Sequence, residues 1–255
     1  KIIMNQYLSE SSNPTLSIVM PVYNDASALL SFLPELCQFL SSKEGRQEIV
    51  IVDDGSTDNV AQVCQDFIAK LPDNTVLRLI TLSRNFGKEA ALSAGLSQSQ
   101  GQVVITMDAD GQHPVSVLVE MLSLYHGGAD MVAAIQSRRQ HEGYLLRSFK
   151  RFFYHFMQDK HRYEIKPNAG DFRLMSRKVV DALLALPERQ RFMKGLYAWV
   201  GFKTVYLPFI ADARVEGESK FNYQNLFELA LVGITSFSQK PLRWISRMGL
   251  LVSIG

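Results

Sequence analysis

The sequence is poor in cysteine and lacks the common glycine-rich phosphate-binding motifs. Its 255 residues include two cysteines, Cys37 and Cys64, whose spacing does not suit a metal site, so we expect buried core thiols and a reducing compartment. Neither a G-x-G-x-x-G stretch nor a Walker-type G-K-[ST] loop occurs, which argues against the usual dinucleotide and P-loop modes of binding. The sequence shows no helix-turn-helix, RNA-binding or zinc-finger signature, so nucleic acid is not an expected partner. Residues 1–15 are too polar for a secretory signal peptide.

The composition is that of a globular protein, but its charge is unevenly distributed. With 47% hydrophobic and 20% charged residues, the chain fits one large α/β domain, alone or with an appendage. Residues 1–137 hold seven Lys and Arg against 15 Asp and Glu, a net charge of −8, whereas residues 138–255 hold 20 against 10, a net charge of +10. This asymmetry predicts a metal-binding region beside a region that faces an anion.

Apolar strands alternate with helices through the first half of the chain. Strands are predicted at residues 16–22, 48–52, 76–82 and 103–107, and helices at residues 26–40, 61–68 and 89–97. This order predicts βαβ units and a mostly parallel sheet flanked by helices. Ser56 or Thr57 would cap the helix over residues 61–68, and Pro114 suits the first turn of a helix after the fourth strand. A strand is also expected near residues 168–175, then a helix over 191–199 and a strand through residue 207.

The most informative residues are Asp108 and Asp110, which directly follow the fourth apolar strand. Two carboxylates at the end of a buried strand are costly unless a cation neutralises them, and Mg²⁺ is commonly shared between one or two carboxylates and substrate phosphates. A solvated turn is the alternative, because Asp and Gly favour turns. Polar residues also follow the other three strands, at 23–25, 53–54 and 84–88, and in a doubly wound sheet such loops converge on one edge. The convergence predicts a ligand site there.

The basic second half combines cationic and aromatic residues in a pattern typical of a membrane surface. A helix over residues 143–160 would place bulky apolar residues on one face and Arg147 and Arg151 on others, which suits a helix at the lipid interface or one packed on its own core. Residues 214–221 form a charged loop that could act as a lid, before an apolar helix over 222–237.

The end of the sequence resembles a juxtamembrane segment. Basic residues and Trp244 precede the apolar residues 248–255, which are fewer than the about 20 residues that a membrane span needs. We therefore expect a catalytic domain over residues 1–212, and over residues 213–255 the lid, an interfacial helix and the start of a transmembrane region that continues beyond Gly255. A plain C-terminal tail is the alternative.

Four ordered motifs resemble those of the inverting glycosyltransferases of family 2, which have a GT-A (Rossmann-like) α/β fold. They are PVYND at residues 21–25, VDDGSTD at 52–58, SRNFGKEAA at 83–91 and DADGQHP at 108–114. The motifs GDFR at 170–173, RF at 191–192, WVGFK at 199–203 and GESK at 217–220 extend the resemblance over nearly the whole chain. Within the family the chain is similar to polyprenyl-phosphate glycosyltransferases, the group of dolichol-phosphate mannose synthase and the bacterial undecaprenyl-phosphate sugar transferases. This family usually has Glu at the position of Asp25.

The resemblance implies a role for each candidate residue. Asp110 and Gln112, together with Asp108, would hold Mg²⁺ or Mn²⁺ at the donor diphosphate. Asp171 would lie near the reacting sugar as a sugar ligand or a base, so the catalytic candidates are Asp108, Asp110 and Asp171. His113 is expected to be a structural residue at a helix start rather than a metal ligand. The residues expected to bind the nucleotide sugar are Pro21, Tyr23, Asp25, Asp53, Asp54, Lys88, Asp108, Arg214, Ser219 and Lys220; for Asp53 and Asp54, turn formation and helix capping is the alternative.

The expected reaction is a metal-dependent, inverting transfer of a hexosyl group from a UDP- or GDP-linked sugar to a polyprenyl phosphate, with undecaprenyl phosphate as the expected acceptor. A lipid phosphate is already anionic near neutral pH, since its second pKa is about 6, so it needs positioning more than a general base. Arg138, Arg147 and Arg151 would bind it. The protein is expected at the cytoplasmic face of a bacterial inner membrane, and a homo-oligomer is left open.

Three other functions compete with this one. A family 2 enzyme that acts on a soluble saccharide would need neither lipid nor Arg147 and Arg151. A nucleotide-sugar-binding membrane module without catalysis would bind the donor with no turnover. A haloacid-dehalogenase-like phosphohydrolase would use Asp108 as nucleophile and Asp110 as acid and base, but it leaves the 53–54 carboxylates unexplained.

Overall fold

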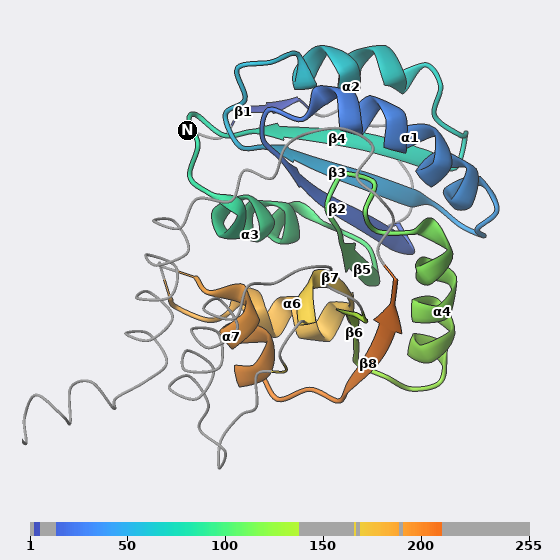
Figure 1. The fold of residues 1–255 in the computed structure, drawn as a ribbon, viewed down its shortest axis with the longest axis vertical. Coiled ribbons are helices and arrows are strands. Elements are labelled where there is room, and N and C mark those ends of the chain that lie inside the picture. Colours follow the sequence, from blue (N-terminus) through green and yellow to red (C-terminus); the bar gives the residue numbers. More distant parts are fainter. Residues whose placement is uncertain (1–2, 6–13, 138–165, 167–168, 189–190, 211–255) are drawn as a thin grey trace, which may run out of the picture. The chain divides into compact units, whose positions relative to one another are not determined.

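An eight-stranded sheet with helices on both faces carries the described part of the fold (Figure 1). The computed structural model describes residues 3–5, 14–137, 166, 169–188 and 191–210. The chain divides into two units, one formed by residues 1–138, 169–187 and 202–218 and the other by residues 139–168, 188–201 and 219–255. All eight strands of the sheet belong to the first unit.

The strand order determines where a ligand can bind. The order is β1-β4-β3-β2-β5-β7-β6-β8, with β4, β3, β2 and β5 mutually parallel and β8 parallel to β6. The chain therefore adds β3 and then β4 on one side of β2, and then returns to form β5 on the other side of β2. The strands are β1 (Ile3–Asn5), β2 (Leu16–Val22), β3 (Gln47–Asp53), β4 (Thr75–Thr81), β5 (Val103–Thr106), β6 (Met131–Gln136), β7 (Ala169–Ser176) and β8 (Thr204–Phe209).

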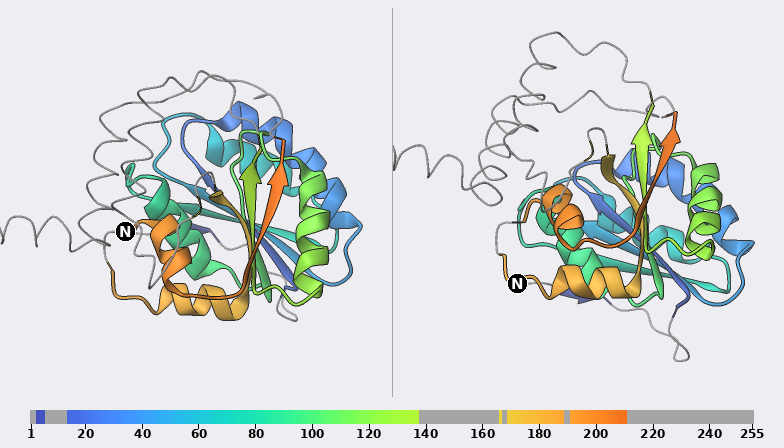
Figure 2. Two further views of the ribbon diagram at one scale, coloured as in Figure 1. Left: turned by 60° about the horizontal axis from the view of Figure 1, so that its bottom comes forward. Right: turned by 90° about the horizontal axis from the view of Figure 1, so that it is seen from below.

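Helices cover both faces of the sheet, as the views in Figures 1 and 2 show. The helices α1 (Ala26–Ser41), α2 (Val60–Ile68) and α4 (Val115–His126) share one apolar core with the sheet. The helices α3 (Lys88–Gln98) and α6 (Arg177–Leu184) pack on the strands from the other face. The packing of α3 is close, because a Cβ atom on Gly95 would lie 2.3 Å from Cγ1 of Val19 in β2.

Coverage of both faces explains why the strands appear in the sequence as uninterrupted apolar runs. All seven residues of β3 are buried, as expected for a parallel strand with helices on either side. Both cysteines are buried and free, and burial raises the pKa of the Cys37 thiol to about 11 and that of Cys64 to about 12. The prediction of core thiols is confirmed.

The sequence predictions of the main strands and helices are confirmed, with three differences. The strands β1 and β6 and the helix α6 were not predicted. The helix α4 begins at Val115, so Pro114 is its N-cap rather than a first-turn residue. The prediction that Ser56 or Thr57 caps α2 is wrong, because α2 begins at Val60 with Asn59 at the N-cap. Ser56 and Thr57 instead contact Asn24 in the neighbouring loop, where Ser56 accepts the Asn24 N–H and Thr57 donates to the Asn24 side chain.

The strand β7 runs against both of its neighbours, β5 and β6. It pairs Thr106 with Arg173 and Val103 with Ser176, so β7 starts at the edge of the sheet where β5 ends. Asp171, near the start of β7, is therefore brought to the same edge as the loop that follows β5.

Of the second unit, the structure describes residue 166, residue 188 and residues 191–201. They include the predicted helix, observed as α7 (Met193–Trp199), in which Met193, Leu196 and Tyr197 are buried. The helices predicted over 143–160 and 222–237, the predicted lid, and the predicted domain 213–255 lie outside the described residues. Within the described residues, none of the helices combines the length and the apolar character that a membrane span requires.

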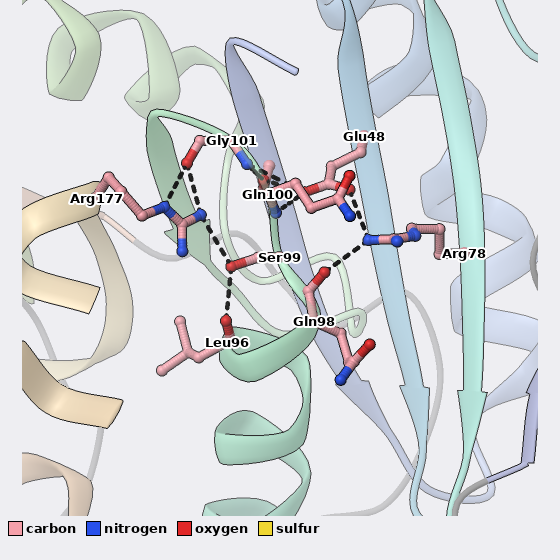
Figure 3. Close-up of polar contacts among 9 residues, drawn as sticks. Glu48, Arg78, Leu96, Gln98, Ser99, Gln100, Gly101 and Arg177 are labelled. Atoms are coloured by element: carbon pink, nitrogen blue, oxygen red, sulfur yellow. Dashed lines mark hydrogen bonds and ion pairs between the residues drawn. The ribbon is translucent and has the colours of Figure 1, made fainter. Parts of the chain in front are cut away.

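A buried polar cluster holds the C-terminal end of α3 at the amino-terminal side of the strands (Figure 3). Arg78 of β4 donates to the Gln98 carbonyl oxygen at 2.6 Å and contacts Oε2 of Glu48 at 3.3 Å. The other carboxylate oxygen of Glu48 accepts hydrogen bonds from the Ser17 hydroxyl and from the Gln100 and Gly101 backbone N–H groups. The side chains of Arg78 and Glu48 are 7% and 1% exposed, so each charge depends on the other for compensation.

We expect Arg78→Met to lower the free energy of unfolding by about 3–5 kcal/mol, because it leaves the Glu48 carboxylate buried without its cation. The double variant Arg78→Met/Glu48→Gln should recover about half of this loss, because it removes the uncompensated charge. Urea unfolding measures both variants. Asp181→Asn, at a side chain that is 63% exposed and 3.8 Å from Arg177, is the control and should change the free energy by less than about 0.5 kcal/mol. Equal destabilisation of the single and double variants would contradict this assignment.

Candidate active site

Polar loops after the parallel strands meet at one edge of the sheet. The strand order reverses between β2 and β5: the chain runs outward from β2 through β3 to β4, and then returns to form β5 on the other side of β2. The loops that follow β2 and β5 lie on either side of this reversal. In open α/β sheets this reversal leaves a crevice at the carboxyl ends of the strands, which is the usual place for a ligand. Tyr23, Asn24 and Asp25 follow β2, and Asp108 follows β5.

The loop over residues 53–58 connects the loops on both sides of it. On one side, the Asn24 side-chain oxygen accepts the Thr57 N–H at 2.7 Å, and the Asp58 carboxylate accepts the Ala26 N–H at the first residue of α1 at 3.0 Å. The Asn24 backbone has a positive φ of 49°, a conformation that Asn tolerates better than most residues. These contacts hold the end of β2 and the start of α1.

On the other side of the 53–58 loop, Asp54 holds the loop between β4 and α3. Its two carboxylate oxygens accept the backbone N–H groups of Phe86 and Gly87, each at 2.8 Å, just before α3 begins at Lys88. Gly55 lies against the backbone of this loop: a Cβ atom there would be 2.4 Å from the Arg84 carbonyl carbon. Asp53 accepts the Ser56 N–H at 2.8 Å within its own turn. The turn formation that the sequence left open as an alternative describes the contact of Asp53, whereas Asp54 joins its loop to the loop before α3.

Lys88 joins two carboxylates that come from distant parts of the chain. Its Nζ lies 2.6 Å from Oδ1 of Asp108 and 3.5 Å from Oδ2 of Asp171. Partial burial lowers the pKa of Lys88, but the two carboxylates more than offset this and raise it above its usual value. The Lys88 and Asp108 side chains are 43% and 33% exposed, so a ligand can reach them. The arrangement holds positive and negative charge next to each other at the reversal of the strand order.

Asp171 is more enclosed than Asp108 and keeps an unsatisfied acceptor. Its side chain is 12% exposed, and its Oδ1 atom is buried without a hydrogen-bond partner among the described residues. The Thr106 hydroxyl donates to the Asp171 carbonyl oxygen and so fixes the start of β7 against the end of β5. A buried acceptor without a donor is costly, so Oδ1 suits a hydroxyl group supplied by a ligand.

The loop over residues 108–113 is held by two internal hydrogen bonds. Oδ1 of Asp110 accepts the Gln112 N–H at 3.1 Å, across Gly111 at a φ of +72°. The Nδ1 atom of His113 accepts the Asp108 N–H at 3.0 Å. Burial lowers the pKa of His113 below its usual value, although Asp108 and Asp110 oppose this shift. These contacts agree with the structural role expected for His113.

The donor atoms of the 108–113 loop fit a hard divalent cation that also binds a ligand. No group of three or more His, Cys, Asp or Glu side chains in the described part of the chain could hold a metal. Asp108 and Asp110 nevertheless supply two carboxylates, and Gln112 can add an amide oxygen. Mg²⁺ is usually held by one or two carboxylates, with substrate phosphates and water completing its shell. The set is therefore suited to a metal that arrives with a phosphate-containing ligand.

The structure brings many of the predicted site residues to this edge of the sheet. Pro21 lies in β2, Tyr23 is 39% exposed, and Asp25 is the N-cap of α1. Other predicted residues lie outside the described part of the chain: Arg138, Arg147, Arg151, Arg214, Ser219 and Lys220.

Sequence reasoning missed the positioning contacts of Asp58 and Thr106. Asp58 caps a helix that is 32 positions away, and Thr106 contacts a strand 65 positions away. Thr106 could have been noticed, because it is a polar residue at the end of an apolar run. Nothing in the sequence marks Asp58, which is typical of a turn residue.

Comparison with protein families identifies the chain through most of its length. The model of the family "Glycosyl transferase family 2" matches residues 17–184. An uncharacterized glycosyltransferase of Synechocystis is 41% identical over 94% of this chain and 74% of its own. The bactoprenol glucosyl transferase of Shigella phage SfV is 40% identical over 93% of this chain and 76% of its own, and the prophage bactoprenol glucosyl transferase homolog of Escherichia coli is 39% identical over 93% and 77%.

Solved structures with low sequence identity share the fold. Glucosyl-3-phosphoglycerate synthase from Mycobacterium tuberculosis, in complex with Mn²⁺, UDP and phosphoglyceric acid, superposes with a TM-score of 0.60 at 16% identity, over 85% of this chain and 75% of its own. A mannosyltransferase from Pyrobaculum calidifontis, in complex with GDP-Man and Mn²⁺, has a TM-score of 0.58 at 20% identity, over 85% of this chain and 60% of its own. The predicted GT-A fold is confirmed.

We expect Asp54→Ala to release the loop before α3, because the Phe86 and Gly87 N–H groups both lose their acceptor. The free energy of unfolding should fall by about 1–3 kcal/mol, and hydrogen exchange at these two amides should accelerate. Asp54→Asn retains one acceptor oxygen, so it should protect one amide and cost less. Asp66→Ala, on the exposed face of α2, is the control. Unchanged exchange at residues 86–87 in Asp54→Ala would show that Asp54 does not hold this loop.

Proposed function

The chain belongs to glycosyl transferase family 2, and from this we propose that it transfers a glucosyl group from a nucleotide sugar to undecaprenyl phosphate. The names of the bactoprenol glucosyl transferases, at about 40% identity over most of the chain, support this acceptor and this sugar. In the structure, one observation carries the proposal: Asp108 and Asp171 share Lys88 at the reversal of the strand order, beside the loop of Asp110. The family match also argues against the phosphohydrolase alternative.

The donor nucleotide would lie over the ends of β2 and β3. Pro21, Tyr23, Asp25 and Asp53 would line the pocket for the base and ribose. Asp54 would shape this pocket rather than contact the donor, because both of its oxygens accept backbone hydrogen bonds from the neighbouring loop. Lys88, with the 214–220 segment outside the described residues, would supply positive charge toward the donor phosphates.

Asp110 and Gln112, with Asp108, would hold Mg²⁺ or Mn²⁺. When bound, the ion neutralises the charge that develops on the nucleoside diphosphate as it leaves. Lys88 holds Asp108 and Asp171 in place through its ion pairs, and the partial exposure of Asp108 leaves it open to the donor. Asp171 would orient the sugar, because its buried Oδ1 can accept a hydrogen bond from a sugar hydroxyl.

The acceptor determines how much proton transfer the protein must perform. An oxygen of the lipid phosphate attacks the anomeric carbon, a new C–O bond forms to that oxygen, and the bond to the donor diphosphate breaks. The attacking oxygen is already anionic near neutral pH, because a second phosphate pKa of about 6 leaves it ionised, so no general base is required. Direct displacement inverts the anomeric centre.

Arg138, Arg147 and Arg151 are proposed to bind the lipid phosphate, in a protein associated with the cytoplasmic face of a bacterial inner membrane. The net charge of +10 over residues 138–255 supports this placement, because basic segments are attracted to anionic lipid surfaces. The donor enters from the aqueous side, and the product stays in the membrane. A soluble saccharide acceptor is the competing proposal within the same family.

The acceptor is tested by incubating the protein with UDP-glucose labelled in the sugar and with undecaprenyl phosphate, dolichyl phosphate or a soluble saccharide, in the presence of Mg²⁺ or Mn²⁺. We expect label in the organic phase with undecaprenyl phosphate, and at least about tenfold less product with the saccharide. GDP-mannose serves as the competing donor. Transfer to the saccharide without lipid would overturn the lipid acceptor, and donor binding without any turnover would favour a module that lacks catalysis.

Asp110→Asn should abolish the metal-dependent part of donor binding and lower transfer by about 100-fold or more, because it removes a charged ligand from the diphosphate site. Calorimetric titration of UDP with and without Mn²⁺ measures binding, and the lipid assay measures transfer. Asp181→Asn is a matched carboxylate on α6, exposed and paired with Arg177, and should leave both unchanged. Wild-type metal-dependent binding in Asp110→Asn would refute the metal assignment.

A further inference from the structure

The loop that carries Asp108 and Asp110 is closed at its base by one side chain. The His113 Nδ1 atom accepts the Asp108 N–H at 3.0 Å, five residues away. Because Nδ1 accepts, the ring must carry its proton on Nε2. Between these two residues, Asp110 accepts the Gln112 N–H. One hydrogen bond therefore joins the two ends of the loop, and a second lies within it.

Two aromatic side chains, from β7 and β8, contact the ring of His113. It stacks on Phe172 of β7, with ring centroids 4.3 Å apart and planes at 17°, and meets the edge of Phe209 of β8 at 5.9 Å. Phe172 and Phe209 contact each other at 5.6 Å with nearly perpendicular rings. Phe172 is 1% exposed and Phe209 is 9% exposed, so the His113 ring lies against two side chains of the packed core.

The stacking partner connects the loop to the other catalytic candidate. Phe172 directly follows Asp171, whose carboxylate shares Lys88 with Asp108. A ring that is hydrogen-bonded to the Asp108 backbone and stacked on the residue after Asp171 sets the distance between the two segments.

We propose that His113 is a positioning residue: its Nδ1 holds the backbone of the metal-binding loop at Asp108, and its ring aligns that loop with Asp171 through Phe172. The role of the loop in metal binding rests on the proposed function, whereas the contact of His113 with Asp108 does not. Groups that orient the ligands of a metal, without touching it, commonly change metal affinity by about 10- to 100-fold when they are replaced.

Two other roles for His113 make different predictions. If the ring only fills the core, Phe should replace it without consequence, because Phe keeps the stacking on Phe172. If His113 binds the metal through Nε2, an amide oxygen at that position should replace it. The Asn side chain places its amide group the same number of bonds from Cα as Nδ1, and the Gln side chain places it at the distance of Nε2. The three substitutions therefore separate the three roles.

The test compares wild type, His113→Phe, His113→Asn and His113→Gln in two measurements. Hydrogen exchange of the Asp108 amide, without metal, reports the contact itself. The Mn²⁺ dissociation constant in the presence of UDP, followed by the electron paramagnetic resonance signal of free Mn²⁺, reports its effect on the loop. Thermal unfolding is recorded for every variant, and His126→Phe at the end of α4 is the matched control.

We expect His113→Phe to accelerate exchange at Asp108 and to weaken Mn²⁺ binding by about tenfold, even where its melting temperature stays close to that of wild type. His113→Asn should bring the exchange rate of the Asp108 amide close to that of wild type and the Mn²⁺ dissociation constant to within about threefold. His113→Gln should restore neither quantity. Rescue by Gln but not by Asn would overturn the proposal in favour of an Nε2 ligand. Wild-type exchange and affinity in His113→Phe would overturn it in favour of core filling.

The exchange measurement also separates this proposal from the function on which it partly rests. If wild type binds no Mn²⁺ with UDP, the metal-binding role of the loop fails together with the proposed function. Faster exchange in His113→Phe would then still show that the side chain holds the Asp108 backbone. If wild type binds Mn²⁺ and His113→Phe binds it equally well, the positioning role fails and the proposed function stands.

Discussion

The site depends on the hydrogen bonds that the loop over residues 53–58 makes to the loops on either side of it. The loops and helix starts that follow parallel strands have backbone N–H groups with no partner in the sheet, and here several of them are satisfied by side chains. Asp54 accepts two N–H groups before α3, and Asp58 accepts the first N–H of α1. As a consequence, Lys88 at the start of α3 and Tyr23 after β2 are held relative to one another by contacts that involve no ligand.

The topology of the sheet brings the remaining catalytic candidates to the same group of loops. The return of the chain from β4 to β5 puts Asp108 beside the end of β2, and the reversed direction of β7 puts Asp171 at the same edge. Because α3 is held at its far end by Arg78 and packs closely on β2 at Gly95, the position of Lys88 is determined from both ends of its helix. Lys88 is thereby placed within reach of both Asp108 and Asp171.

Much of this could be predicted from the sequence, and the rest has identifiable physical reasons for being missed. The apolar runs of β2 to β5 predict buried parallel strands, and the polar residues after them predict the edge of the site. The orientation of β7 could not be predicted, because the alternation of side chains is the same in parallel and antiparallel strands. The pairing of Lys88 with Asp108, 20 positions away, depends on the strand order and so on tertiary structure. The contact of His113 with Asp108 requires the backbone of the loop, which no residue pattern specifies.

Charge explains why such a site would need a metal. Asp108, Asp110 and Asp171 lie in two neighbouring segments, and Lys88 contacts Asp108 and Asp171. A nucleoside diphosphate would add further negative charge to this cluster of carboxylates, so the donor would be repelled unless positive charge accompanies it. A divalent ion at Asp108, Asp110 and Gln112 can supply part of it, and the basic residues after position 137 can supply the rest. Under the proposed function, two anionic substrates would meet over this cluster of carboxylates, and the basic second half of the chain would supply the positive charge that this requires.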